Sequence, residues 1–256
     1  MLNEYLDFYK DNFFTVIPIK SRAKAPEISG WQYRRQEDFN PAEFGDETNV
    51  GVVLGDASGG LVDIDLDCKE ALILAPLFLP PTSLRFGRKS KPESHHFYRC
   101  QNQGRTVRLS SSDGKTLLEC RGNGGQTVVP PSIHPRGELI EFSEKASPAL
   151  ADFDDLLLQC KLMAATIELS PHWQGGCRHE LSLAVAGALI RADVSLDGAF
   201  NVVKGICRLT GDEEEEDRLL ISPARRNFRY WHKADIDADA EQCPLLGVKR
   251  TSADAP

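Results

Sequence analysis

The chain has 256 residues, of which 41% are hydrophobic and 27% are charged, and it carries a formal net charge of −8 at pH 7. These proportions are ordinary for a globular protein and suit one large domain, or a large domain with a smaller one. The negative total argues against tight non-specific binding of nucleic acid by the whole surface, but it is compatible with a local basic groove.

The cysteines and the hydropathy indicate the compartment. The seven cysteines are an odd number and form no CxxC pair, which argues against a disulfide framework and against a zinc finger. No apolar run reaches about 18 residues, so we expect no transmembrane helix. Residues 1–10 lack the pattern of a signal peptide. We therefore expect a cytoplasmic protein without a membrane partner.

The first 60 residues alternate between regular elements and loops. Apolar residues at helical spacing predict an amphipathic helix over residues 2–13. Short apolar runs predict strands over residues 14–19 and 49–54, and a basic loop with Pro and Gly follows the first of them over residues 20–31. A Gly-rich turn over residues 55–60 predicts a hairpin between the second strand and the next one.

The stretch from Leu61 to Asp67 carries the clearest chemical signal. Apolar residues alternate with Asp63 and Asp65, which predicts a strand with both carboxylates on one face. Two adjacent carboxylates repel each other unless a positive charge lies between them, and Mg²⁺ or Mn²⁺ is the usual solution. The alternative is a solvated strand face, or a turn at Asp65-Leu66-Asp67.

The region up to residue 150 continues as short strands with one further helix. An apolar segment over residues 69–79 predicts a helix that stops at Pro80-Pro81, and a basic stretch occupies residues 82–91. Further strands are expected over residues 94–99, 116–120, 126–129 and 139–142.

After residue 150 the hydrophobic period becomes helical. Helices are predicted over residues 153–167, 179–192, 198–209 and 212–220. We accordingly expect a catalytic domain over residues 1–150, a helical accessory domain over residues 168–235 and a flexible tail over residues 236–256.

Other residues extend the acidic pair into a candidate site. Glu119 lies on a separate predicted strand, where a third metal ligand is expected, and only one of His95 and His96 can face the same side of a strand. Ser132 and His134 follow two prolines in a rigid turn. Taken singly, each has an ordinary alternative as a solvated surface residue.

Together these residues resemble the primase-polymerase (Prim-Pol) domain of the archaeo-eukaryotic primase superfamily, in the form found in replication proteins of plasmids, phages and mobile elements. The resemblance extends to about residue 145. It rests on the strings Val62-Asp63-Ile64-Asp65, Ser94-His95-His96-Phe97-Tyr98 and Leu118-Glu119, and above all on the run from Glu119 to His134.

The resemblance implies an α+β fold with an RRM-like antiparallel sheet core, a smaller α/β unit beside it and the active site in the cleft between them. A C-terminal α-helical bundle would follow. The implied activity is that of a DNA primase and/or DNA polymerase, which transfers a nucleotide from NTP or dNTP to a 3′-hydroxyl on a single-stranded DNA template.

The resemblance also implies roles for individual residues. Asp63, Asp65 and Glu119 would hold Mg²⁺ or Mn²⁺, and His95 would act beside them as a catalytic residue that contacts the triphosphate, with His96 as the alternative. The implied nucleotide-binding residues are Arg88, Lys89, Lys91, Ser94, His96, Arg121, Gln126, Ser132 and His134.

The second half of the chain resembles the helical segment that follows many Prim-Pol domains and links them to a helicase. Arg178 and His179, at a helix start after two glycines, are candidate template-binding residues, and a plain helical packing module is the alternative. A helicase domain or protein is a possible partner, although the sequence contains no GxxxxGK[ST] loop. Two other functions stay open, namely a metal-dependent nuclease or phosphohydrolase and a catalytically inactive template-binding module.

Overall fold

The structure is a computed structural model, and it describes residues 2–45, 48–102, 104–214 and 216. The chain divides into two compact units between Glu168 and Leu169. The expected tail over residues 236–256 lies outside the described residues, and so does most of the helix expected over residues 212–220. In the described part of the chain, no helix is both long enough and apolar enough to cross a bilayer.

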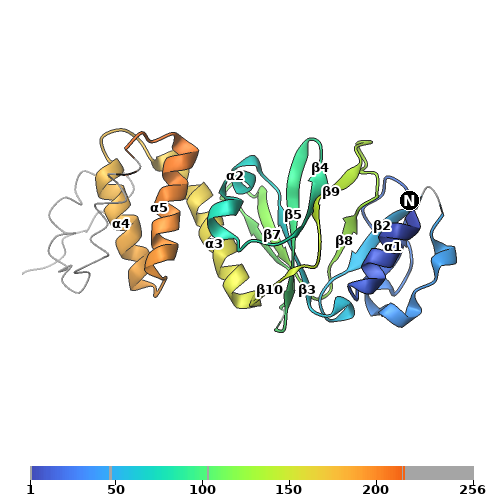
Figure 1. Ribbon diagram of the computed structural model, residues 1–256. Helices are drawn as coiled ribbons and strands as arrows, with labels where there is room; N and C mark the ends of the chain where they lie inside the picture. The colour runs from blue at the N-terminus through green and yellow to red at the C-terminus, as the bar shows by residue number, and fades with distance from the viewer. Residues whose placement is uncertain (1, 46–47, 103, 215, 217–256) are drawn as a thin grey trace, which may run out of the picture. The chain divides into compact units, whose positions relative to one another are not determined.

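The first unit contains three α-helices, four short 3-10 helices and ten strands among its described residues, and Figure 1 shows their arrangement. The helices are α1 (Leu2–Asp11), α2 (Lys69–Phe78) and α3 (Phe153–Leu169), the last of which ends at the division between the units. The strands are β1 (Thr15–Ile19), β2 (Asn49–Val53), β3 (Leu61–Leu66), β4 (Leu84–Arg88), β5 (Lys91–Cys100), β6 (Val107–Ser110), β7 (Thr116–Arg121), β8 (Gln126–Val129), β9 (Ile140–Lys145) and β10 (Ala149–Ala151).

These strands form two sheets, and the α+β class expected from the sequence is confirmed. The smaller sheet has the antiparallel order β1-β2-β8. The larger sheet has the order β6-β7-β3-β5-β4-β9, with antiparallel neighbours, and β10 adds to β5 in parallel. In Figure 1, α1 accompanies the smaller sheet. Strand β3, which carries Asp63 and Asp65, lies inside the larger sheet between β5 and β7.

The predicted hairpin between β2 and β3 is wrong, because the two strands belong to different sheets. Only one bridge joins their ends, between Gly55 and Leu61. The buried hydroxyl of Ser58 in the connecting turn accepts a hydrogen bond from the Thr15 backbone N–H and donates one to the Val53 carbonyl. The turn is therefore fixed to the smaller sheet, and the chain crosses from one sheet to the other.

The basic stretch over residues 82–91 also differs from the expectation, because it contains strand β4. Leu84 and Phe86 are fully buried, while the arginines between and after them remain partly exposed. Apolar side chains alternate with cationic ones in this segment, as on a strand with one buried face. The high content of cationic residues obscured this pattern in the sequence.

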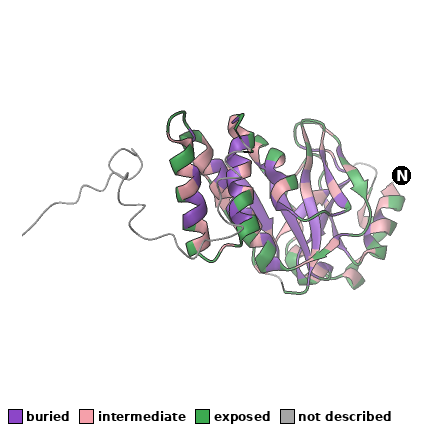
Figure 2. Cartoon of the chain, turned by 60° about the vertical axis from the view of Figure 1, so that its left-hand side comes forward, coloured by how far each residue is buried: buried purple, intermediate pink, exposed green. Residues whose placement is uncertain are grey.

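A hydrophobic core fills the space between the two sheets and α1. It contains Leu6, Tyr9, Phe14, Val16, Val50, Val52, Leu54, Leu61, Leu84, Phe86, Phe97, Val129 and Ile140. The central strands β3 and β7 of the larger sheet are largely buried on both faces, and buried residues concentrate in the middle of the sheet (Figure 2). Strand β3 shows this along its whole length, because Val62, Ile64 and Leu66 are fully buried as well, on the face opposite the aspartates.

The second unit is helical in its described part. Its elements are the short 3-10 helix η5 (Ser170–His172) and the helices α4 (Arg178–Arg191) and α5 (Leu196–Thr210), which pack together. Buried Trp173 donates its Nε1–H to Asp212 Oδ2 at 2.8 Å, and Arg178 pairs with the other oxygen of this carboxylate at 3.2 Å. These contacts close the start of α4 against the end of α5.

Replacing Ile64 by alanine should lower the free energy of unfolding by about 2–5 kcal/mol, because it leaves a cavity beneath the strand that carries the aspartates. Ile73 on the neighbouring helix α2 is 44% exposed, so Ile73→Ala should change the stability by less than about 0.5 kcal/mol. Urea unfolding followed by circular dichroism measures both. Equal effects of the two substitutions would show that β3 is not the packed centre of the unit.

Candidate active site

Side chains on the inner face of β3 run from the hydrophobic core to an open pocket. Leu61 and Asp63 are completely buried, Asp65 is 5% exposed, and Asp67, just after the strand, is exposed. Alternate residues on a strand share one face, so these four residues lie in one row. The acids therefore occupy different depths, although they follow one another at equal spacing in the sequence.

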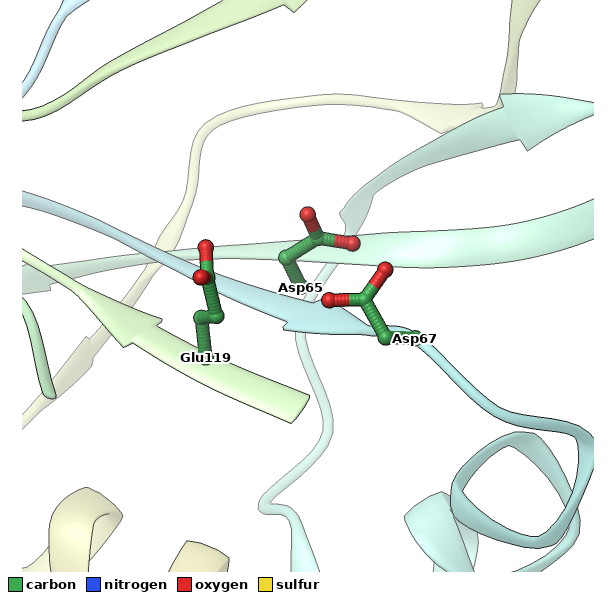
Figure 3. Close-up of side chains that lie close together, drawn as sticks. All are labelled: Asp65, Asp67 and Glu119. Atoms are coloured by element: carbon green, nitrogen blue, oxygen red, sulfur yellow. The ribbon is translucent and has the colours of Figure 1, made fainter. Parts of the chain in front are cut away.

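Three carboxylates converge at the shallow end of this row. Asp65, Asp67 and Glu119 each offer an oxygen within 4.8 Å of the others (Figure 3). Glu119 on β7 lies directly opposite Asp65 in the register of β3 and β7. The structure thus brings Glu119 to Asp65 as expected, but the third member of the cluster is Asp67 rather than Asp63.

Asp63 has other partners because it lies one step deeper on the strand. Its Oδ2 is 3.0 Å from His95 Nδ1 and accepts a hydrogen bond from the Thr127 hydroxyl at 2.6 Å. Burial raises the pKa of Asp63, but His95, Arg121 and Thr127 outweigh it, and the net effect is a lowered pKa. Asp63 is therefore ionised, and its contacts differ from those of the clustered carboxylates.

Cationic side chains hold the clustered carboxylates together. Arg121 places Nη2 2.6 Å from Asp65 Oδ2 and Nε 2.6 Å from Glu119 Oε2. Lys91 Nζ lies 3.1 Å from Asp67 Oδ1. Burial raises the pKa of Glu119, but Arg121 and Arg108 outweigh this and lower it. The sequence interpretation assigned Arg121 and Lys91 to nucleotide binding and did not anticipate this bridging role.

The structure distinguishes the two adjacent histidines. His95 lies opposite Asp65 in the register of β3 and β5, and its ring stacks on Phe86 at 4.7 Å with an interplanar angle of 8°. His96 points to the other face, where its Nε2 contacts the Glu93 carbonyl at 3.0 Å. Burial lowers the pKa of His96 to about 4. His95, rather than His96, therefore faces the acids.

A pocket of about 480 Å³ opens beside the acidic cluster. It is lined by strands of both sheets and by loop residues. Eight residues expected from the sequence line it, namely Asp65, Arg88, Lys91, Ser94, His95, Arg121, Gln126 and His134. The structure adds Lys24, Asp67, Thr127 and Arg136 to its walls. Of these, only Asp67 has a signal in the sequence, because it continues the alternate spacing of Asp63 and Asp65.

The remaining expected residues lie elsewhere. Lys89 is exposed in the turn between β4 and β5. Buried Ser132 accepts a hydrogen bond from the Val50 N–H at 2.8 Å and so secures the smaller sheet. Arg178 and His179 belong to the second unit, where Arg178 pairs with Asp212.

Four buried polar atoms in the pocket wall have no hydrogen-bond partner. They are Asp65 Oδ1, Ser94 Oγ, Gln126 Oε1 and His134 Nε2. In the part of the chain that the structure describes, only two other buried side-chain atoms share this condition, Arg85 Nε and Arg178 Nε. Since buried polar groups are nearly always paired, this concentration indicates that the pocket is built to take a polar ligand.

His134 presents a hydrogen-bond donor to this pocket. Its Nδ1 accepts from the Arg136 backbone N–H at 3.2 Å, so the proton of the neutral ring lies on Nε2. Burial, followed by the nearby charges of Arg88 and Lys24, lowers the pKa of His134. The ring is therefore neutral near pH 7, and its Nε2–H is free to meet a ligand acceptor.

The acidic cluster suits a hard divalent cation. Carboxylate oxygens are the ligands that Mg²⁺ and Mn²⁺ prefer. Asp65 Oδ1 is buried without a hydrogen-bond partner and has only the more distant charges of Lys91 and His95, each 3.8 Å away. The donor set and this unpartnered atom therefore fit a metal site.

Comparison with protein families gives an independent assignment. Residues 6–152 match the Prim-Pol family, described as the N-terminal part of bifunctional DNA primase/polymerase. A search of curated proteins gave no match. The matched region is more than half of the chain, and it contains the acidic cluster, His95 and the pocket. The chain therefore belongs to the Prim-Pol family and carries a primase/polymerase-type domain.

Proposed function

We propose that this protein is a metal-dependent nucleotidyltransferase that acts as a DNA primase and/or DNA polymerase. It would transfer a nucleotide from NTP or dNTP to a 3′-hydroxyl on a single-stranded DNA template. The observation that carries the proposal is the convergence of Asp65, Asp67 and Glu119 beside a pocket with four unpartnered buried polar atoms. The family assignment supports the same general role.

The proposed cofactor is Mg²⁺ or Mn²⁺, held by Asp65, Asp67 and Glu119. When bound, such an ion activates the attacking oxygen and neutralises charge on the leaving pyrophosphate. Arg121 bridges Asp65 and Glu119, so it keeps these carboxylates close together despite their like charge. Asp63 was expected as a further ligand, and its Oδ2 contacts His95 and accepts a hydrogen bond from Thr127.

The cationic wall of the pocket suits a triphosphate. Arg88, Lys91, Lys24 and Arg136 line it together with His95 and His134, and arginine and lysine side chains bind phosphate oxygens well. Ser94 Oγ and His134 Nε2 can donate hydrogen bonds to the same group. Gln126 Oε1 is an acceptor only, so it suits a sugar hydroxyl or an amino group of a base.

The wider setting follows from the same assignment. The protein would serve in replication of a plasmid, phage or mobile element, with a helicase domain or protein as a possible partner. Arg178 and His179 of the second unit would contact the template. Six cysteines among the described residues form no disulfide, which fits a reducing cytoplasm.

Two other functions would use the same residues differently. A metal-dependent nuclease or phosphohydrolase would need the carboxylates but would remove label from a DNA end instead of adding nucleotides. An inactive template-binding module would bind single-stranded DNA in the Asp65→Ala variant, and its wild type would synthesise nothing.

Asp65→Asn should reduce nucleotide incorporation by about 1,000-fold, because losing a ligand removes several kcal/mol of charge stabilisation. Extension of a labelled primer on single-stranded DNA with Mg²⁺ or Mn²⁺ measures this, and unprimed template tests initiation. EDTA should abolish the wild-type activity.

Asp113 provides the matched control, since it is an exposed acid at the turn between β6 and β7. Asp113→Asn should leave incorporation unchanged. Full activity in the Asp65→Asn variant would disprove the metal site, and release of nucleotides without synthesis would favour the nuclease.

Divalent cations should stabilise the folded chain through the acidic cluster. At 100 times its dissociation constant, Mn²⁺ should add about 2.7 kcal/mol to the free energy of unfolding. Arg121→Gln should lower the stability without metal and increase the response to Mn²⁺, because the carboxylates lose their bridging cation. Thermal unfolding with and without Mn²⁺ measures both effects, and an undiminished response in Asp67→Asn would contradict the assignment.

His134→Phe should raise the KM for the nucleotide about 10-fold with little change in kcat, because one hydrogen bond to a charged group is lost. Burial and neighbouring cations lower the pKa of His134, so this difference should be the same at pH 7 and pH 8. His134→Gln keeps an N–H donor and should recover part of the affinity. Steady-state incorporation kinetics provide the measurement, and a fall in kcat at constant KM would contradict this role.

A further inference from the structure

Glu138 is a charged residue that supports the pocket without lining it. Its Oε1 accepts a hydrogen bond from the Ser90 backbone N–H at 2.8 Å, and its Oε2 accepts one from the Ser90 hydroxyl at 2.6 Å. Arg88 donates to the same Oε2 through Nε at 3.0 Å. Both carboxylate oxygens of Glu138 therefore contact the hairpin tip, residues 88–91, where β4 turns into β5.

The hairpin tip needs support because the pairing of β4 with β5 is irregular next to it. The register of the two strands shifts between Phe86 and Arg88. On the other strand, Glu93 has a φ of 48°, a left-handed conformation that is uncommon outside glycine. The hydrogen bonds of Glu138 therefore hold a segment beyond the point where regular strand pairing is interrupted.

Glu138 also closes a second turn of the pocket wall. Its backbone carbonyl accepts a hydrogen bond from the His134 N–H at 2.8 Å. This turn brings His134 and Arg136 to the pocket, and the hairpin tip brings Arg88. The backbone and the side chain of Glu138 thus join two segments that supply phosphate-binding candidates from different parts of the sequence.

The contact with Glu138 fixes how Arg88 presents its charge. A guanidinium is planar, so a hydrogen bond at Nε restricts the plane of the whole group. Ser90 Oγ, 3.1 Å from Nε, adds a second contact on the same edge. Nη1 and Nη2 have no partner among the residues that the structure describes. The fold therefore holds Nε and leaves the two terminal nitrogens for a ligand in the pocket.

We propose that Glu138 is a positioning residue that holds Arg88 and the hairpin tip in place, so that Nη1 and Nη2 of Arg88 bind phosphate oxygens of the nucleotide. The inference rests on the proposed function for the identity of that ligand. Because Glu138 does not line the pocket, it acts through Arg88 and not by touching the nucleotide.

Charge and position make opposite predictions for the loss of Glu138. A negative charge near cationic side chains weakens their attraction for phosphate, so Glu138→Gln would tighten phosphate binding if only net charge mattered. Glutamine has one acceptor oxygen where glutamate has two, so it cannot keep both Ser90 and Arg88 in place. If Glu138 positions Arg88, the same substitution therefore weakens phosphate binding.

The first test measures the binding of inorganic tripolyphosphate by isothermal titration calorimetry in metal-free buffer. Glu138→Gln should raise the Kd about 10-fold, as expected when a hydrogen bond to a charged group is lost. An unchanged or lower Kd would overturn the proposal, and so would wild-type protein that binds no tripolyphosphate.

Glu144 provides the matched control, because it also pairs with an arginine of β4. Its Oε2 lies 2.7 Å from Arg85 Nη2, and neither residue lines the pocket. Glu144→Gln should leave the Kd for tripolyphosphate unchanged. A similar rise in both variants would reduce Glu138 to a general contribution to the fold.

The second test is a double-mutant cycle on nucleotide incorporation. Glu138→Gln should raise the KM for the nucleotide about 10-fold and change kcat less than about twofold, because the lost interaction concerns binding. In the Arg88→Ala background, Glu138→Gln should change KM less than about twofold, because its partner is already absent. Losses that multiply, or a fall in kcat at constant KM, would overturn the proposal.

Failure of the proposed function would look different. Wild-type protein that incorporates no nucleotide under any metal condition would disprove the polymerase assignment. The calorimetry would still decide whether Glu138 positions Arg88 for phosphate, because it needs neither template nor turnover.

Discussion

The candidate site depends on keeping like-charged carboxylates close together at the end of β3. Asp65, Asp67 and Glu119 bring their oxygens within 4.8 Å, where they would repel one another without compensation. Arg121 contacts both Asp65 and Glu119, and Lys91 forms an ion pair with Asp67. The pKa of Glu119 is lowered although burial alone would raise it. Cationic side chains on β5 and β7 thus offset the repulsion within the cluster.

The aspartates of β3 have the same chemistry but different contacts, because they are buried to different depths. The smaller sheet and the hydrophobic core bury Leu61 and Asp63 completely, and burial begins to decrease at Asp65. A completely buried carboxylate needs protein partners for its charge, and Asp63 has His95 and Thr127. A carboxylate at the pocket wall can leave one oxygen without a protein hydrogen bond, as Asp65 does with Oδ1. The two carboxylates therefore have different partners because they lie at different depths.

The sequence predicted most of the larger elements, because hydrophobic alternation and turn residues are local signals. It also placed Asp63 and Asp65 on one face, brought Glu119 to Asp65 and preferred His95. It could not predict which two aspartates would meet Glu119, because alternation gives a face and says nothing about depth. Depth comes from the smaller sheet, whose strands lie at residues 15–19, 49–53 and 126–129. The resemblance implied a smaller unit beside the main sheet, but the hairpin predicted between β2 and β3 hid that β2 pairs with β1 and β8.

The pocket wall also contains residues that the sequence could not assign to it. Lys24 and Arg136 belong to loops, and nothing in their local sequence relates them to β3. A contact over a long chain distance places Lys24 there, because Gln126 Nε2 donates to the Lys24 carbonyl at 2.7 Å. Arg136 lies beside His134 through a local hydrogen bond, in which its backbone N–H donates to His134 Nδ1. The same contacts leave Gln126 Oε1 and His134 Nε2 without partners. When one polar atom of a side chain forms a hydrogen bond within the fold, its other polar atom is held in a fixed position. The hydrogen bonds that support this pocket therefore also fix the positions of the two unpartnered atoms.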